Sequence, residues 1–154
     1  MQSHEPKNYQ CPFCKIAKGI EYESVSTKPA DIFYQDKFIT AFVASHWWSN
    51  NPGHVIIIPN RHIENIYSLP DSLSEKIHSF EKKVAIAMKE LYNCDGISSR
   101  QHNEPAGWQD VWHYHLNIFP RYKDDKLYEL HSKKYLSKEK DRIPYAKKLK
   151  KYFY

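Results

Sequence analysis

The alternation of polar and apolar side chains is sharpest between Val111 and Arg121, where the chain reads VWHYHLNIFPR. In a strand, side chains at every second position share one face. His113, His115 and Asn117 would then stand in a row, with apolar residues on the opposite face. Three hydrogen-bonding groups in a row are costly to bury unless each has a partner. We therefore predict a strand over 111–121 that carries a functional site.

Other short apolar runs predict further strands. Ile32–Gln35 and Phe38–Val43 flank a two-residue turn, which is typical of a hairpin. His54–Pro59 is rich enough in β-branched residues to be buried on both faces, and proline stops it. Ile97–Arg100 is a candidate for one more short strand. Together these runs indicate a sheet.

The longest helix has a clear pattern between Ser72 and Tyr92. Apolar residues recur there at helical spacing and form one stripe, and Ser72 with Glu75 fits a capping box. A last helix is expected to begin near Ile143 and Pro144, because proline is tolerated in a first turn. The order of elements predicts an α+β fold, in which the long helix packs on an antiparallel sheet of about five strands and a helical extension follows.

Length and composition fit one globular domain of 154 residues with 41% hydrophobic content. We expect an N-terminal extension over 1–10, a main domain over 11–131 and a basic C-terminal tail over 132–154. The net charge is +5, and lysines crowd the tail. A solvated helix face explains such a tail more often than nucleic acid does, so we do not expect a nucleic-acid partner. Without a long apolar run or a secretory signal, we predict a cytoplasmic protein with no membrane partner.

Cysteine usage points to metal or redox chemistry. Cys11 and Cys14 form a C-x-x-C pair, and Cys94 stands alone. In a reducing compartment such a pair is more typical of a metal or redox site than of a structural disulfide. Zinc takes four nitrogen or sulfur ligands, so two more must come from elsewhere, and the chain has nine histidines. His62 follows a buried strand and His113 lies on the central one, which makes them better candidates, but position alone leaves the choice open.

Three motifs, CPFCKI near the start, NNPGHVIIIPNRH in the middle and WQDVWHYHLNIFPR late, resemble the histidine triad (HIT) family. The resemblance extends from Cys11 to Arg121, in the family's order and spacing. The family signature is three histidines that alternate with apolar residues. His113 and His115 match the first two, and Asn117 occupies the place of the third. The resemblance implies a HIT-like fold, a nucleotide or dinucleotide substrate and a homodimer.

The resemblance also implies roles for single residues in a nucleotide hydrolase or nucleotidyltransferase. His115 matches the histidine that attacks an α-phosphate and carries the nucleotidyl group covalently. A neutral imidazole is a good nucleophile at about pH 7, which suits this role. His54 matches a site histidine close to the transferred phosphate. Asn103 and Gln109 match loop residues that contact the phosphates.

In the zinc-containing branch of the family, the metal is held by the C-x-x-C pair, a later histidine and the first triad histidine. Carried over to this chain, the ligands are Cys11, Cys14, His62 and His113. The zinc would be structural, because all four positions are filled and no water is left to activate.

Two departures from the family pattern bear on function. Asn117 cannot give a proton to a leaving group, and general acid catalysis is typically worth about 10²–10⁴-fold in rate. A phosphoanhydride such as a dinucleoside polyphosphate, whose leaving group needs little protonation, is therefore favoured over a phosphoramidate. Ala44 stands where many members have an aspartate that grips the ribose. Trp47 and Trp48 follow and can stack a base, and Trp47 is the candidate for substrate binding.

Two other interpretations remain open. The first is a catalytically weak or inactive nucleotide-binding protein with the HIT fold, owing to Asn117. The second is a zinc-stabilised interaction or nucleic-acid module that uses the basic tail.

Overall fold

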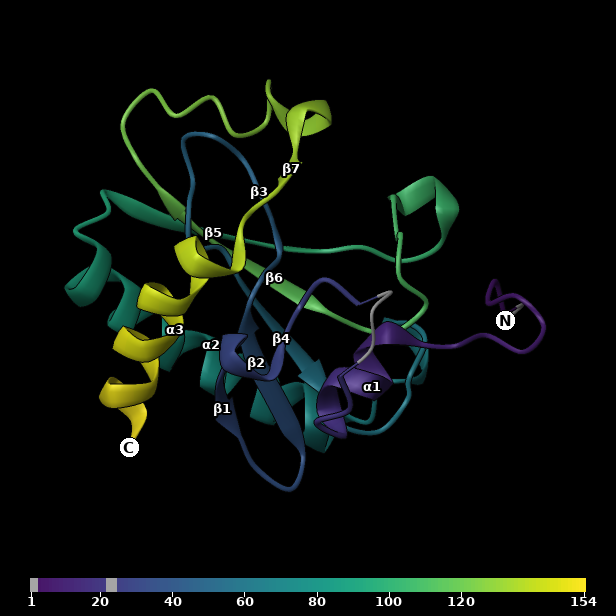
Figure 1. Cartoon of the computed structure of the whole chain (residues 1–154). Helices are drawn as coiled ribbons and strands as arrows, with labels where there is room; N and C mark the ends of the chain where they lie inside the picture. Colours follow the sequence, from purple (N-terminus) through teal and green to yellow (C-terminus); the bar gives the residue numbers. More distant parts are fainter. Residues whose placement is uncertain (1–2, 22–24) are drawn as a thin grey trace.

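The computed structural model describes residues 3–21 and 25–154, so residues 1–2 of the predicted N-terminal extension lie outside the described part. Five antiparallel strands form the central sheet in the order β1-β2-β4-β6-β5 (Figure 1). Their bounds are β1 (Ile32–Gln35), β2 (Ile39–Val43), β4 (Val55–Pro59), β5 (Gly96–Gln101) and β6 (Leu116–Arg121). A two-stranded sheet pairs β3 (His46–Trp47) with β7 (Tyr135–Leu136). The predicted α+β class and five-stranded sheet are confirmed.

Helices complete the described fold and cover the sheet (Figure 1). The α-helices are α1 (Pro12–Ala17), α2 (Asp71–Tyr92) and α3 (Glu139–Phe153). The 3₁₀ helices are η1 (Pro29–Asp31), η2 (Ile66–Ser68), η3 (Pro105–Gly107) and η4 (His131–Lys133). Among the described residues, no helix combines the length and the apolar character needed to cross a membrane.

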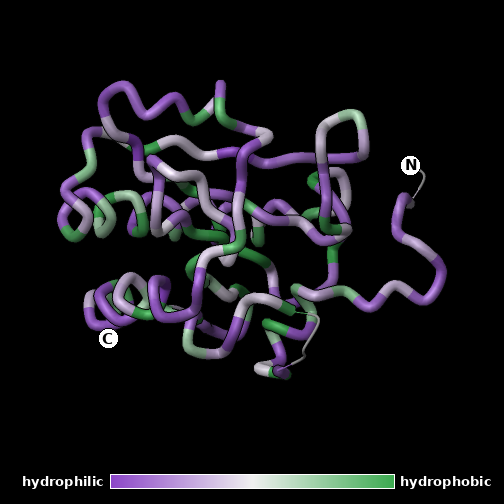
Figure 2. The backbone as a smooth tube through the Cα atoms, turned by 45° about the horizontal axis from the view of Figure 1, so that its top comes forward, coloured by the Kyte–Doolittle hydropathy of each residue, from purple (hydrophilic) through white to green (hydrophobic). Residues whose placement is uncertain are grey.

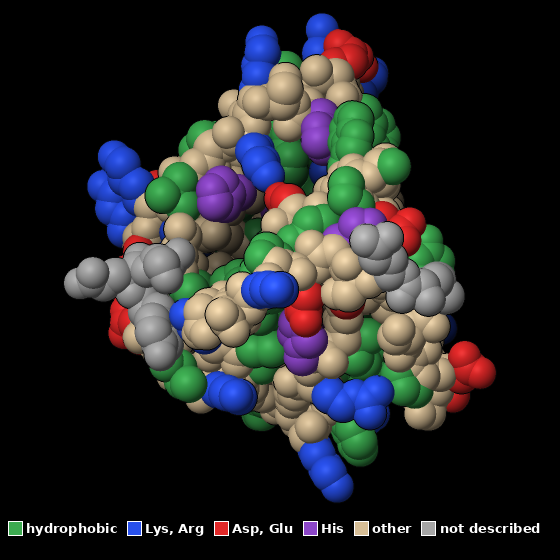
Figure 3. Space-filling model, turned by 90° about the vertical axis from the view of Figure 1, so that its right-hand side faces the viewer, with side chains coloured by type: hydrophobic (Ala, Val, Ile, Leu, Met, Phe, Trp, Pro, Cys, Tyr) green, Lys and Arg blue, Asp and Glu red, His purple; other side chains and the backbone are tan. Residues whose placement is uncertain are grey.

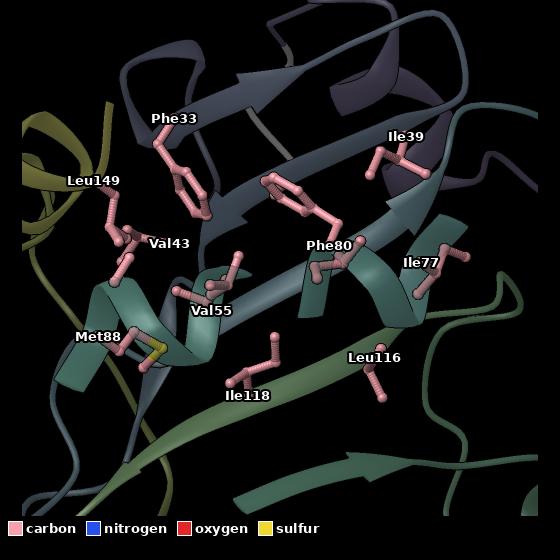
Figure 4. Packing of buried hydrophobic residues seen from close by; sticks show 14 of the residues in the cluster. Phe33, Ile39, Val43, Val55, Ile77, Phe80, Met88, Leu116, Ile118 and Leu149 are labelled. Carbon is pink, nitrogen blue, oxygen red and sulfur yellow. The ribbon is translucent and has the colours of Figure 1, made fainter. Parts of the chain in front are cut away.

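The main core lies between α2 and the sheet. Ile77, Phe80 and Met88 of α2 meet Val55 and Ile118 of neighbouring strands (Figure 4). The helix presents these residues on one side because apolar positions recur at helical spacing. Fully burying one such side chain stabilises the fold by about 1.5–3 kcal/mol. This packing covers one face of the sheet.

Strand alternation decides which side chains reach the opposite face. Leu116 and Ile118 of β6 join the core under α2, so Asn117 between them lies on the other face. Phe13 of α1 packs on that other face, against Phe42 of β2. The polar groups of the predicted site therefore lie on the face that α2 leaves open.

The strand predicted over 111–121 is shorter than expected. β6 begins at Leu116, and residues 111–115 form bends and irregular backbone. The N–H of Tyr114 donates to the carbonyl of Ile63 (2.6 Å), and the N–H of His113 donates to that of Val111 (2.8 Å). These bonds replace a ladder to the neighbouring strands, so His113 lies in a turn before β6.

The long helix begins one residue before its predicted start, whereas the prediction for the start of the last helix and the predicted capping box are wrong. α2 begins at Asp71 without a capping box, because the carbonyl of Pro70 accepts the N–H groups of Leu73 and Ser74 instead. α3 begins at Glu139, about one turn before the predicted start, and holds Pro144 in its interior. The missing N–H of this proline removes one helical hydrogen bond, while acidic residues in the first turn complement the helix dipole.

The C-terminal helix α3 contributes to the same core as the sheet. Ala146 and Leu149 are buried in the main cluster. In Figure 2, hydrophobic positions recur along this mostly hydrophilic helix. The domain boundary after residue 131 stays a prediction, because core residues lie on both sides of it.

Candidate functional site

Two sulfur and two nitrogen donors converge beside α1. The Sγ of Cys11 lies 3.3 Å from Nδ1 of His113, and the Sγ of Cys14 lies 3.3 Å from Nδ1 of His62. All four donor atoms lie within 4.8 Å of one another. Ligand atoms about 2.0–2.3 Å from a tetrahedral zinc ion have separations of this size. The structure thus brings the four predicted metal ligands together.

The local fold explains why these donors meet. Cys11 directly precedes α1 and its Sγ accepts the N–H of Cys14, so one helical turn sets the two thiols side by side. His62 follows β4, and His113 precedes the neighbouring strand β6. Nε2 of His113 donates to the carbonyl of Pro59 (2.9 Å), which leaves Nδ1 facing the thiols. Burial raises the pKa of the Cys11 thiol to about 12, so a thiolate there needs a cation beside it.

His115 lies on the cavity side of the same segment. Its Nδ1 donates to the carbonyl of His113 (2.8 Å), so the lone pair is on Nε2. Burial lowers the pKa of the ring, which keeps the imidazole neutral at about pH 7. The ring packs edge-on against Phe13, and Nε2 lies 3.9 Å from Oδ1 of Asp110. A neutral imidazole with a fixed tautomer has the properties of a nucleophile.

The buried His54 and the half-buried Asn117 form a pair next to His115. Nδ1 of His54 lies 3.1 Å from the carbonyl oxygen of His46, and Nε2 lies 2.9 Å from Oδ1 of Asn117. Both ring nitrogens thus face oxygen, although a neutral imidazole has one N–H. Burial lowers the pKa of His54 to about 4, so the ring is neutral and only one of its nitrogens donates. The amide nitrogen of Asn117 donates to the carbonyl of Arg100 (3.4 Å). A neutral imidazole and an amide are both weak acids, so the pair holds no proton for a leaving group.

A cavity of about 240 Å³ connects these residues. His54, His115 and Asn117 line it, as does Ala44. Apolar residues from α1 and its surroundings form the other side; they are Pro12, Phe13, Ile16, Val25, Phe42, Ile56 and Val111. Figure 3 shows a hollow on this face of the molecule, with histidine and lysine side chains at its rim. An apolar wall opposite a few polar groups is the usual form of a small-molecule site.

The two tryptophans take different places. Trp47 is buried in the main core, where its ring centroid lies 5.4 Å from that of Tyr145 in an edge-to-face contact. Trp48 lines the cavity and packs against His54. Successive residues of an extended chain point to opposite sides, and β3 ends at Trp47. Trp48, and not the predicted Trp47, therefore reaches the cavity.

Asn103 and Gln109 lie outside the cavity lining and shape the loop between β5 and β6. Oδ1 of Asn103 accepts the N–H of Ile66 (2.8 Å). The buried Gln109 side chain donates to the carbonyls of Glu64 and Val111 and accepts one backbone N–H. Their contact with phosphates stays a prediction.

Sequence reasoning missed Asp110 and Lys134, which line the cavity with His115. Nζ of Lys134 lies 3.0 Å from Oδ2 of Asp110. The position of Asp110 in the motif WQDVWHYH was an available signal. The sequence offers no such signal for Lys134, because the pairing of β7 with β3 carries it to the cavity.

The family described as HIT domain matches residues 25–124. A relative from Bacillus subtilis, named protein hit, is 32% identical over 112 residues, which are 73% of this chain and 71% of the relative. The chain belongs to the HIT family. The resemblance carried by the sequence motifs is thereby confirmed.

Other similar proteins include two that are named for an enzyme activity. An adenosine 5'-monophosphoramidase from Saccharomyces cerevisiae is 29% identical over 116 residues, which are 75% of this chain and 65% of the relative. A zinc-bound histidine triad family protein from Mycobacterium smegmatis superposes with a TM-score of 0.73 at 24% identity, over 92% of this chain and 91% of that one. A Plasmodium falciparum diadenosine triphosphate hydrolase, solved with cyclomarin A, superposes with a TM-score of 0.69 at 18% identity, over 92% of this chain and 96% of that one. At these identities the two structures show the fold alone.

Proposed function

We propose that this HIT protein hydrolyses or transfers nucleotidyl groups at an α-phosphate, through a covalent nucleotidyl group on His115. The observation that carries the proposal is the hydrogen bond from Nδ1 of His115 to the carbonyl of His113 (2.8 Å). It leaves the Nε2 lone pair at the cavity, which His115 lines. The similarity to an adenosine 5'-monophosphoramidase, which is named for a nucleotide substrate, supports the same class of reaction.

The reaction has two displacements. In the first, Nε2 of His115 forms a bond to the α-phosphorus, and the bond from phosphorus to the leaving group breaks, its electron pair going to the leaving atom. In the second, water or an acceptor hydroxyl forms the new P–O bond, its proton passes to solvent, and Nε2 recovers its lone pair. Dividing one difficult displacement into two lowers each barrier.

The preferred leaving group is a phosphate. The neutral His54 and the Asn117 amide that face each other supply hydrogen bonds but no proton. A phosphate leaves without much protonation, whereas an amine leaves poorly without a general acid. Dinucleoside polyphosphates therefore fit this site better than phosphoramidates.

Zinc is the metal that fits the donor cluster. Two thiols and two imidazoles form a common zinc-ligand set, and the similar Mycobacterium smegmatis protein is described as zinc-bound. Cys11, Cys14, His62 and His113 would hold it and tie α1 to the segments beside β4 and β6. With all four positions filled by protein ligands, the ion would supply stability and take no part in the displacement by His115.

A second candidate function is nucleotide binding without turnover. Asn117 favours it, because the His54–Asn117 pair lacks a general acid. Ala44 lines the cavity and offers no carboxylate to bind the ribose. Trp48 also lines the cavity, and its ring is the aromatic contact for a base. A homodimeric assembly and a cytoplasmic location stay predictions.

Chemical trapping distinguishes the two functions. Wild-type protein is incubated with diadenosine triphosphate, quenched, digested and searched for a peptide in which His115 carries an adenylyl group. His115→Ala should lose the label and lower turnover by about 10⁴-fold or more. The matched control is His78→Ala on α2, whose ring contacts Glu81 at the surface, and it should behave as wild type. Equal nucleotide binding in all three proteins, with no label and no turnover in any, would favour the binding protein.

A further inference from the structure

The C-terminal segment reaches the cavity through β7. β7 pairs with β3, which sets Leu136 opposite His46. Ser137 continues the attachment, since its N–H and its hydroxyl donate to the carbonyl of Ser45 at 2.9 and 2.8 Å. Lys134, directly before β7, lines the cavity although it lies outside the residues that match the family, 25–124.

A buried arginine, Arg142, holds the segment around β7 in place. Nε of Arg142 lies 2.9 Å from Oδ1 of Asp31, and both side chains are buried. The same guanidinium donates to the carbonyl of Ser137 (2.6 Å) and to that of Ser26 (3.0 Å), a residue of the cavity wall. The backbone that carries Lys134 is therefore fixed to the cavity wall.

The Lys134 side chain itself lies in an exposed ion pair. It is 47% exposed, and its partner Asp110 is 60% exposed. Exposed ion pairs contribute little net free energy, so this one opens at small cost. Among the described residues, Lys134 is also the only lysine or arginine that lines the cavity.

Asp110 links the lysine to the nucleophile. One carboxylate oxygen lies 3.0 Å from Nζ of Lys134, and the other lies 3.9 Å from Nε2 of His115. A phosphate that contacts Nε2 comes close to this carboxylate, and like charges repel. The lysine offsets that repulsion, and it gains a stronger partner when phosphates enter.

We propose that Lys134 is a phosphate-binding residue, held by Asp110 in the free protein and turned toward the leaving group when a polyphosphate occupies the cavity. This inference rests on the proposed nucleotidyl chemistry and narrows its substrate class. The favoured substrate carries at least one phosphate beyond the α-phosphate, because only such a leaving group offers Lys134 an anion. A phosphoramidate with an uncharged leaving amine gains nothing from it.

Paired substrates test the inference. Lys134→Ala should lower kcat/KM for diadenosine triphosphate by about tenfold, the loss expected for one charge-assisted hydrogen bond. For an adenosine phosphoramidate with an uncharged leaving amine, the same variant should stay within about twofold of wild type. Lys134→Arg should keep most of the activity, and Asp110→Asn should raise kcat/KM for diadenosine triphosphate because it releases the lysine and removes a negative charge.

Lys133→Ala is the matched control, since Lys133 is the adjacent exposed lysine and does not line the cavity. Equal losses on both substrates, or equal losses in Lys133→Ala and Lys134→Ala, would overturn the inference. Calorimetry with ATP separates its failure from that of the proposed function. If wild type turns over neither substrate, Lys134→Ala should still weaken ATP binding by about tenfold relative to Lys133→Ala. Unchanged ATP affinity would then exclude Lys134 as a phosphate-binding residue.

Discussion

The donor cluster beside α1 and the cavity next to it are built on histidines only two positions apart. In each region one ring nitrogen donates to a backbone carbonyl and the other stays available. Nε2 of His113 donates to the carbonyl of Pro59, and Nδ1 faces the thiols. Nδ1 of His115 donates to the carbonyl of His113, and Nε2 faces the cavity. The proposed roles, metal ligand for His113 and nucleophile for His115, therefore differ according to which ring nitrogen the backbone carbonyl binds.

The two regions also share a side chain of α1. Phe13 packs edge-on against both rings, with centroid distances of 5.9 Å to His113 and 5.2 Å to His115. The cluster ties together three segments of the chain, while the His115 side chain ends at the cavity. We therefore expect stability to depend mainly on the first region and turnover on the second.

Metal removal should give the largest effect. With the metal at about 1,000 times its dissociation constant, a chelator should lower the free energy of unfolding by about 4 kcal/mol. Cys14→Ser should be less stable and insensitive to the chelator, whereas His115→Ala should keep the full chelator-dependent loss. Denaturant titrations with and without chelator measure this. Cys94→Ser is the control, since Cys94 lies apart from the cluster and should respond as wild type does. Metal-free purified protein with no chelator response would contradict the four-ligand site.

Asn117→His should give the next largest effect, in the cavity alone. An imidazole at this position supplies the missing proton, so hydrolysis of an adenosine phosphoramidate should rise by about 10²-fold. That is about 2.7 kcal/mol in activation free energy. Diadenosine triphosphate should respond much less, because its leaving group needs little protonation. Asn117→Gln, which keeps an amide, should not show the gain, and equal gains on both substrates would argue against a missing general acid.

The end of β6 that lies away from the donor cluster is held by the carboxylate of Asp125, which bonds Arg121. Asp125 accepts bonds from Nε and Nη2 of Arg121 at 2.7 and 2.8 Å and from Asn51 at 2.7 Å. These bonds, above all those from Arg121, hold the pKa of Asp125 well below its usual range. A carboxyl group whose pKa is lower in the folded state than in the unfolded state stabilises the protein at pH values above the unfolded-state pKa, which is about 4 for aspartate. That contribution is lost as the pH falls toward the folded-state pKa.

Asp125→Asn should therefore give the smallest of the three effects. We expect a loss of about 2 kcal/mol at neutral pH and a shallower decline in stability below about pH 4. Urea titrations at several pH values measure both. Asp124→Asn is the matched control, because this neighbour is exposed. A pH profile unchanged from wild type would show that the Arg121–Asp125 pair does not support the fold.

Local periodicity predicted the sheet and the long helix because burial on one face repeats along the sequence. The four candidate metal ligands could be predicted only from the family resemblance, since spacing alone did not select His62 and His113. The start of β6 was not predictable, because it depends on a bond from Tyr114 to the distant Ile63. The place of Lys134 at the cavity was not predicted either, because a long-range strand pairing brings it there.

The Arg142–Asp31 pair has a consequence for synthesis of the chain. Its two partners are 111 residues apart in sequence, and Arg142 also holds Ser26 of the cavity wall. A contact across so many residues costs loop-closure entropy, and Arg142 is synthesised long after Asp31. On the ribosome, the strands and α2 can assemble while Asp31 still lacks its partner. The cavity wall gains its anchor only when Arg142 has emerged, so a nascent chain that ends before residue 142 still lacks a finished site.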